Sequence, residues 1–380
     1  MPGIYAVLLI GPTIPLPAPE PLSSAIESIE VRNSDEGRDV FQIVFSIGRS
    51  STLSDALLDY SLIKNPLLNN FNRVIIMVLF GFRSTVLIDG IITHKQLSPS
   101  NEPGNSRLTI TGEDVSFMMD RKEMSITHPS QPDIAIVTKL IASYWQYGLV
   151  PSVIPPASID VPTILTRTPA QQTTDLQYIK SLAKQYDYVF YVEPTPVPGV
   201  NTAYWGPKTY TGIPQKALTL NMGSDTNVTS ISFQYSSVES TLVTGSVQDP
   251  ILNMKIPVIT VKSLRPPLAL FPDLLVNIAN AKNKQYRASG GVNVLQAYNE
   301  AQSTTEASTD AVTATGEVDS IAYADVLHAR RLVGLRGIGF MHDGLYYVKN
   351  VTHKISKGDY KQAFTISREG LGSTTPVVNP

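Results

Sequence analysis

Short runs of alternating apolar and polar residues, or of β-branched and aromatic residues, dominate the first third of the chain. Residues 26–31 (IESIEV) and 40–47 (VFQIVFSI) flank the polar turn SDEGRD, which predicts a β-hairpin. Three more strand-like runs follow at 74–82 (VIIMVLFGF), 85–99 (TVLIDGIITHKQLSP) and 106–120 (SRLTITGEDVSFMMD). Short strands separated by turns predict a small antiparallel barrel or sandwich.

The period of the pattern changes in the middle of the chain. Residues 133–145 carry apolar side chains at helical spacing, before Gly148. A second predicted helix begins with a capping box, Thr174 and Gln177, and has one apolar face: Leu176, Ile179, Leu182, Ala183 and Tyr186. Because this helix leads directly into the strand-like run 188–192 (YVFYV), we expect an α/β unit inside a mostly β chain.

The second half of the chain is less regular. Residues 194–216 are rich in Pro, Gly and Thr and predict a long loop, whereas strand alternation resumes over 218–235. Prolines interrupt 250–285, and the Ala, Ser, Thr and Gln of 286–316 are typical of a weak helix or a linker. In the last block, 317–370, glycine-containing turns separate strand-like runs, which predicts a compact β-meander.

These patterns predict a mainly β chain with α/β insertions, an α+β fold class. We expect five parts: a first β-barrel domain at 1–125, an α/β helix–strand region at 126–195, second-barrel strands with loops and an Ala/Ser/Thr-rich linker at 196–316, further barrel strands at 317–370 and a tail at 371–380.

The composition argues against several classes of function but does not identify one. The chain has 380 residues with 30 basic and 32 acidic side chains, a net charge of −2, so we expect no nucleic-acid partner. It has no cysteine, which excludes disulfides and Cys-based metal sites. The apolar run near the N-terminus lacks a basic region before it, and 74–82 is too short to cross a bilayer as a helix. We therefore expect a soluble protein without direct membrane insertion.

No catalytic motif is evident in the sequence. None of the five histidines belongs to a metal-binding pair, and Glu113 and Asp114 point to opposite faces of their strand. We expect His353 to be a surface or interface residue and the glycines of 334–339 (GLRGIG) to mark a bulge or close backbone packing. For the basic group Arg330, Arg331 and Arg336 we favour salt bridges across a subunit boundary. We predict no enzyme activity, no cofactor and no metal.

Two alternatives to a structural protein stay open. A carbohydrate-binding adhesin built from β-sandwiches would use exposed aromatic side chains, and Tyr204 and Trp205 in the predicted loop are the best candidates. A cell-wall hydrolase at a tail tip would need a pair of carboxylates across a sugar, and no such pair is evident.

Three stretches resemble the phage late control D family, the hubs of contractile tails and injection systems. They are 85–120, already quoted in part, then 173–194 (TTDLQYIKSLAKQYDYVFYVEP) and 343–373 (DGLYYVKNVTHKISKGDYKQAFTISREGLGS). The third is the most specific. The stretches span the chain from end to end, and the leader, the loop near 195–215 and the region 250–310 match least.

The resemblance implies a homotrimer in which each subunit carries two related antiparallel β-barrel domains, so that six barrels form a pseudo-hexameric ring. It implies a baseplate hub that adapts a trimeric spike to a hexameric inner tube, with other baseplate proteins as neighbours. No spike domain follows the barrels, so we expect the spike to be a separate chain. Within 343–368 we expect interaction residues at Tyr346, Tyr347, Lys349, His353, Tyr360, Phe364 and Arg368. Whether the particle is a phage tail or an injection system stays open.

Overall fold

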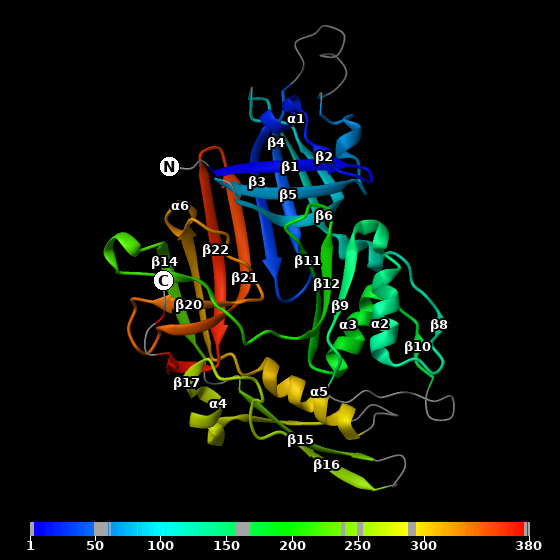
Figure 1. Ribbon diagram of the computed structural model, residues 1–380, viewed down its shortest axis with the longest axis vertical. Coiled ribbons are helices and arrows are strands. Elements are labelled where there is room, and N and C mark those ends of the chain that lie inside the picture. The colour runs from blue at the N-terminus through cyan, green and yellow to red at the C-terminus, as the bar shows by residue number, and fades with distance from the viewer. Residues whose placement is uncertain are drawn as a thin grey trace.

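The structure is a computed structural model of the chain. It describes residues 4–48, 60, 62–81, 83–102, 104–156, 168–236, 240–248, 254–287, 294–375 and 378. The chain is mainly β, with 47% strand and 20% helix, which confirms the expected class. Figure 1 shows a large sheet in the upper and left parts of the molecule, a helix-bearing unit on the right and a smaller lobe below.

One sheet of 13 strands contains most of the predicted strands. Its main path runs β14 (Val228–Tyr235), β19 (Val312–Asp319), β22 (Asp359–Arg368), β21 (Gly344–Ser356), β3 (Ile26–Ser34), β4 (Val40–Ser46), β7 (Arg107–Asp114), β6 (Arg83–Ser98), β5 (Arg73–Phe80), β1 (Ile4–Gly11) and β2 (Leu16–Pro17). Two more strands, β20 (Leu332–Arg336) and β13 (Gln215–Thr219), branch from β21. The predicted hairpin is therefore confirmed as β3 and β4.

The two halves of this sheet pack on separate hydrophobic clusters. The first cluster is built mainly from β1 and β3–β7, with Phe41, Phe45 and Ile76 fully buried. The second is built from β13, β14 and β19–β22 around Tyr346 and Phe364. Apolar residues alternate inward along each strand, so each half buries one face of its strands.

The two halves are joined inside the chain by pairing of β21 with β3. Residues Asn350–Ser356 run antiparallel to Ser34–Ser28. In Figure 1, β21 and β3 lie side by side between β22 and β4. We call this pairing the internal junction.

The α/β unit matches the sequence-based expectation closely. Helix α2 (Asp133–Ala142) is followed by a 3-10 turn, η3 (Trp145–Tyr147), and helix α3 (Asp175–Gln185) begins at the predicted cap, where the Thr174 hydroxyl accepts from the Gln177 backbone N–H. Both helices cover a three-stranded sheet of order β11 (Tyr188–Pro194), β12 (Asn201–Pro207) and β9 (Leu149–Val153). The prediction of a long loop over 194–216 is wrong, because β12 occupies its centre.

Residues 286–316 were expected to form a weak helix or a linker, and the lower lobe shows a helix over part of this range. Residues Val294–Ala307 form helix α5, which covers a small sheet of order β16 (Lys255–Ile259), β15 (Thr241–Gln248) and β18 (Lys282–Gln285). Ala297 and Ala301 are fully buried against that sheet, so the Ala-rich composition serves close packing rather than flexibility. The last block also begins earlier than expected, at Val312 in β19.

Short elements complete the described chain. They are α1 (Glu20–Ser24), η1 (Pro66–Leu68), η2 (Val115–Asp120), β8 (Ile126–Thr127), β10 (Ala170–Gln171), η4 (Gly223–Asp225), β17 (Ala269–Pro272), α4 (Asp273–Val276), η5 (Ile278–Asn280), α6 (Ser320–Tyr323) and β23 (Gly370–Ser373). Strand β23 pairs with β17, so the expected tail 371–380 begins as ordered structure. Residues 376–377, 379 and 380 of that tail lie outside the described ranges.

Candidate functional site

The interaction residues expected on β21 and β22 lie almost entirely inside the subunit. Six of the seven are no more than 5% exposed: Tyr346, Tyr347, His353, Tyr360, Phe364 and Arg368. Only Lys349 is partly accessible, and its ammonium lies 3.4 Å from Asp310. The reason is topological, because β21 and β22 are central strands of the sheet and both have neighbours on each side. These six side chains therefore stabilise the subunit instead of presenting a surface.

His353 differs most clearly from its expected surface position. Its Nδ1 lies 2.9 Å from the Tyr360 hydroxyl, and the ring is 1% exposed. Burial, and to a smaller extent the charge of the neighbouring His328, lower the pKa of His353 to about 3, so the imidazole is neutral at pH 7. It opposes Val31 at the internal junction. His353 is thus a buried packing residue between the two halves of the sheet.

Arg368 supports the turn after β20. Its guanidinium donates hydrogen bonds to the carbonyl oxygens of Asp343 (2.9 Å) and Met341 (2.6 Å) and lies 4.3 Å from the Tyr346 ring centre. The Asp343 carboxylate accepts from the backbone N–H of Ile338 and Gly339, as expected for an Asp before Gly in a turn. Within the GLRGIG segment, Gly337 packs closely against backbone, since a Cβ there would lie 1.8 Å from the Leu220 oxygen, whereas a Cβ on Gly339 would meet no atom within 4 Å.

The three arginines expected at a subunit boundary all find carboxylates within their own chain. Arg331 pairs with Glu193 at 2.5 Å and Arg336 lies 3.8 Å from Asp225. Arg330 reaches across the internal junction, where its Nη1 lies 3.2 Å from Asp39 and its Nε donates to the Ser34 oxygen at 3.0 Å. The boundary that Arg330 bridges is therefore the one between two halves of one subunit.

Arg330 and Asp39 are the centre of a buried polar network. Asp39 accepts from the backbone N–H of Ser34 at 3.0 Å and its own N–H donates to Asp114 at 2.8 Å. Burial and the nearby Asp39 charge raise the pKa of Asp114 to about 6. The guanidinium of Arg330 also lies 4.4 Å from the ring centre of Tyr191 on β11. This network ties both halves of the large sheet to the α/β unit.

A second network ties the α/β unit to the first half of the sheet. Arg73 on β5 forms a two-pronged pair with Asp89 on β6, at 2.8 and 2.7 Å, and donates to the carbonyl oxygens of Tyr147 and Gly199. Asn201 on β12 donates to the same Asp89 at 2.9 Å. Both charges are buried, so their geometry fixes how the two units pack.

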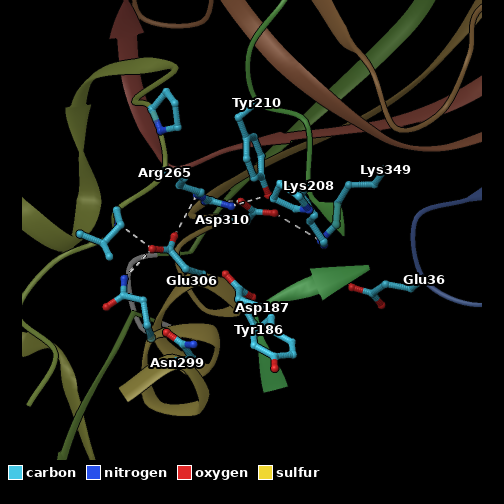
Figure 2. Close-up of a pocket in the computed structure, with 15 residues that line it drawn as sticks. Glu36, Tyr186, Asp187, Lys208, Tyr210, Arg265, Asn299, Glu306, Asp310 and Lys349 are labelled. Atoms are coloured by element: carbon cyan, nitrogen blue, oxygen red, sulfur yellow. Dashed lines mark hydrogen bonds and ion pairs between the residues drawn. The ribbon is translucent and has the colours of Figure 1, made fainter. Parts of the chain in front are cut away.

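A pocket of about 360 Å³ lies where the α/β unit, the large sheet and helix α5 meet (Figure 2). Arg265 is at its centre and pairs with Asp310 at 2.6 Å, with the Tyr210 hydroxyl at 2.7 Å and more loosely with Glu306 at 3.6 Å. Burial raises the pKa of Asp187 to about 6. Since Glu306 and Asp310 are held by Arg265, they form an internal ion network and no free acid–base pair.

Of the aromatic residues proposed for glycan binding, Trp205 is internal and Tyr204 is half-buried. Trp205 lies on β12 with 0% exposure, and its ring makes edge contacts with Tyr186 and Tyr188. Tyr204 stacks on Tyr191 with ring centres 5.0 Å apart. The expectation of an exposed aromatic loop is therefore wrong, and the adhesin hypothesis loses its best candidates.

The parts of the molecule that are open to a partner were not predicted from the sequence. Within the described residues, β14 pairs on one side only, with β19, and the segment His94–Ser98 of β6 pairs on one side only, with β7. Unpaired strand edges carry free N–H and C=O groups that accept another strand. The uncharged sequence of β14, VTSISFQY, is the one signal that indicated such an edge.

No grouping of His, Cys, Asp or Glu among the described residues is suited to hold a metal ion. In the same part of the chain, no helix has both the length and the apolar character needed to span a membrane.

The fold is that of phage tail proteins. The chain superimposes on a tail protein from Neisseria meningitidis MC58 with a TM-score of 0.66 and 13% identity, over 97% of this chain and 98% of that one. A 43 kDa tail protein of prophage MuSo2 from Shewanella oneidensis gives the same TM-score, 0.66, and 13% identity over 97% and 99%. The E. coli c3393 protein, a type VI secretion component, gives 0.55 and 12% over 93% and 77%.

Sequence comparison adds nothing to this likeness. No protein-family model matches the chain. No curated protein matches it in sequence either. At 12–13% identity the structural likeness establishes the fold alone.

Proposed function

We propose that the protein is a non-enzymatic structural component of a phage tail or a tail-derived injection system, and within it the baseplate hub. The observation that carries the proposal is one mostly antiparallel sheet whose two halves each have a separate core, in a chain with the fold of tail proteins. In the pocket around Arg265, the charges of Arg265, Glu306 and Asp310 pair with one another, which fits a role in assembly.

The proposed hub role would explain why the sheet has two similar halves. Three copies with two such barrel-like halves would present six similar units, which matches a hexameric tube on one side and a trimeric spike on the other. This is the arrangement implied by the resemblance of 343–373 to the phage late control D family. Symmetry adaptation of this kind needs a duplicated unit in each chain, because one interface cannot serve both symmetries.

The partners in this proposal are two further copies of the chain, a separate spike protein, the inner tube and other baseplate proteins. Because the side chains first expected to meet them are buried, contact with spike and tube falls to exposed residues elsewhere, with Lys349 the partly exposed member of the original set. The protein would be made in the cytoplasm and incorporated into the particle, without binding nucleic acid or inserting in a membrane.

Native mass spectrometry of the purified chain, alone and with its spike protein, tests the proposal. We expect a trimer, and a trimer that binds one trimeric spike. A monomer under both conditions at micromolar concentration would contradict the hub. Electron micrographs of particles lacking the protein should show tubes and spikes that fail to join, and complete particles without it would contradict the role.

A further inference from the structure

The two halves of the large sheet repeat one strand order. The first half reads β3-β4-β7-β6-β5-β1 and the second reads β14-β19-β22-β21-β20-β13. Matched strands also follow each other in the same order along the chain. Four of the five neighbouring pairs are antiparallel in both halves, and only the last differs, since β1 pairs antiparallel with β5 but β13 pairs parallel with β20.

The register of the strand pairs shifts at corresponding positions in the two halves. The β3–β4 register shifts between Ile26 and Ser28, and the β14–β19 register shifts between Val228 and Ser230. Aligned on this shift, Val31 of β3 corresponds to Phe233 of β14. A bulge adds one residue to one strand and is a specific local feature, so coincident bulges strengthen the correspondence.

The same holds for the longest strand of each half. The β6–β7 register shifts between Ile92 and His94, and the β21–β22 register shifts between Val348 and Asn350. Aligned on this shift, Leu97 of β6 corresponds to His353 of β21. Each of these strands pairs through its first part with β5 or β20, respectively, and through its second part with β7 or β22.

The correspondence identifies what is missing at the open edges. At the internal junction, the second part of β21 pairs with β3, and His353 lies opposite Val31. The matching strands are β6 and β14, and neither has a neighbour on the corresponding side among the described residues. In Figure 1, β14 lies on the left of the molecule, the junction in the middle and β6 to its right, so one chain cannot join its own two edges.

The side chains on these edges suit a strand partner. Tyr235 is 48% exposed and Leu97 is 37% exposed, although both lie on regular strands. Strand β14 has no charged residue and no proline, the devices that usually protect an edge from pairing. Phe233 is partly buried against the second cluster, on the same face as its counterpart Val31 on the first.

We propose that β6 of one copy pairs antiparallel with β14 of the next copy, repeating the internal junction between subunits. The register places Lys95 opposite Tyr235, Gln96 opposite Gln234 and Leu97 opposite Phe233. Leu97 and Phe233 then close the inner face, as His353 and Val31 do within the chain, and the glutamine side chains lie on the outer face. The contact is heterologous, and repeated copies close into a ring when the rotation between neighbours divides a full turn. The ring size, three, rests on the proposed hub function.

Disulfide trapping tests the register directly, because the chain contains no cysteine. Opposed residues in an antiparallel pair have Cα atoms about 4.5–5.5 Å apart, which suits a disulfide. We expect Gln96→Cys/Gln234→Cys to give covalent dimers and trimers under mild oxidation that disappear on reduction. The matched control, Gln96→Cys/Thr229→Cys, uses the same two strands about 17 Å out of register and should give no ladder.

The possible outcomes distinguish a failure of the β6–β14 contact from a failure of the proposed hub function. A ladder from the in-register pair alone supports the β6–β14 contact. A native trimer whose two cysteine pairs cross-link equally, or not at all, overturns this contact and leaves the hub intact. A chain that native mass spectrometry finds monomeric overturns the trimer and the contact together. Each single-cysteine variant should match the parent in native mass, which shows that the substitutions preserve the fold.

Discussion

The internal junction and the open edges of the sheet use the same strand arrangement with different chemistry. At the junction, Arg330 and Asp39 form a buried charged pair, and His353 bonds to Tyr360. On the open edges, β14 carries no charge and most of its side chains are exposed, and the Lys95 ammonium of β6 donates to the Ile63 backbone oxygen of its own chain. A buried charge is stable only while its partner is present. A junction within one chain always has that partner, whereas an edge that pairs only with another copy, as proposed for β6 and β14, would lack it before assembly.

This difference predicts how each region responds to mutation. Changes at the internal junction should lower the stability of the single subunit. Changes at the open edges should leave the subunit folded and affect only association.

Arg330→Ala should have the largest effect. It leaves the Asp39 carboxylate, 1% exposed, without its cation and removes the hydrogen bonds to the Ser34 oxygen. Removing one member of a buried pair costs about 3–5 kcal/mol. Urea unfolding monitored by circular dichroism measures the loss. Arg331→Ala is the matched control, because the neighbouring side chain is 49% exposed and its pair with Glu193 contributes about 0–1 kcal/mol. Equal losses in the two variants would show that the network does not stabilise the junction.

The contribution of His353 should depend on pH. Its pKa is about 3 in the folded chain and near 6.5 when unfolded, so the unfolded state binds more protons between these values. The contribution of the neutral His353 ring to the free energy of unfolding is therefore fully present above pH 6.5. It is lost as the pH falls toward 3, by up to about 1.4 kcal/mol per pH unit.

Unfolding of the parent and of His353→Gln at pH 7.0, 6.0 and 5.0 measures this contribution. Asp114, with its pKa raised to about 6, acts in the opposite direction, and His328, with its pKa lowered to about 4, acts in the same direction as His353. Both are present in the two proteins, so Asp114 cancels in the difference, and His328 cancels except for its charge interaction with His353. We expect the parent to lose more stability than the variant on acidification. Parallel curves would mean that His353 is not buried as a neutral ring.

Local patterns in the sequence predicted the elements whose signals lie within a few residues. The Thr174 cap, the apolar face of α3 and the β3–β4 hairpin are examples, since capping and alternation are local properties. Strand β12 was missed because Pro and Gly in the flanking turns masked a short strand whose partners, β11 and β9, are set by tertiary pairing. The prediction of exposed interaction residues was wrong for the same reason. Whether Tyr346 or His353 is buried depends on the order of the strands in the sheet, and no local sequence pattern contains that order.

Leu97→Lys should have the smallest effect on the subunit and a clear effect on assembly. Leu97 is 37% exposed on an edge, so we expect the free energy of unfolding to change by no more than about 0.5 kcal/mol. In the proposed ring the new ammonium would face Phe233 of the next copy and lose its hydration, which weakens association. Sedimentation velocity over a dilution series measures the fraction of trimer.

Gln96→Lys is the control for this last substitution. It adds the same charge one residue away, but successive side chains on a strand point to opposite faces, so its ammonium keeps its water. We expect Leu97→Lys to dissociate the trimer at a higher protein concentration than Gln96→Lys does. If both variants dissociate alike, net charge governs association. If neither variant dissociates, the second part of β6 lies outside the subunit interface. The internal junction and the open edges would then share the order of their strands but not the pairing between them.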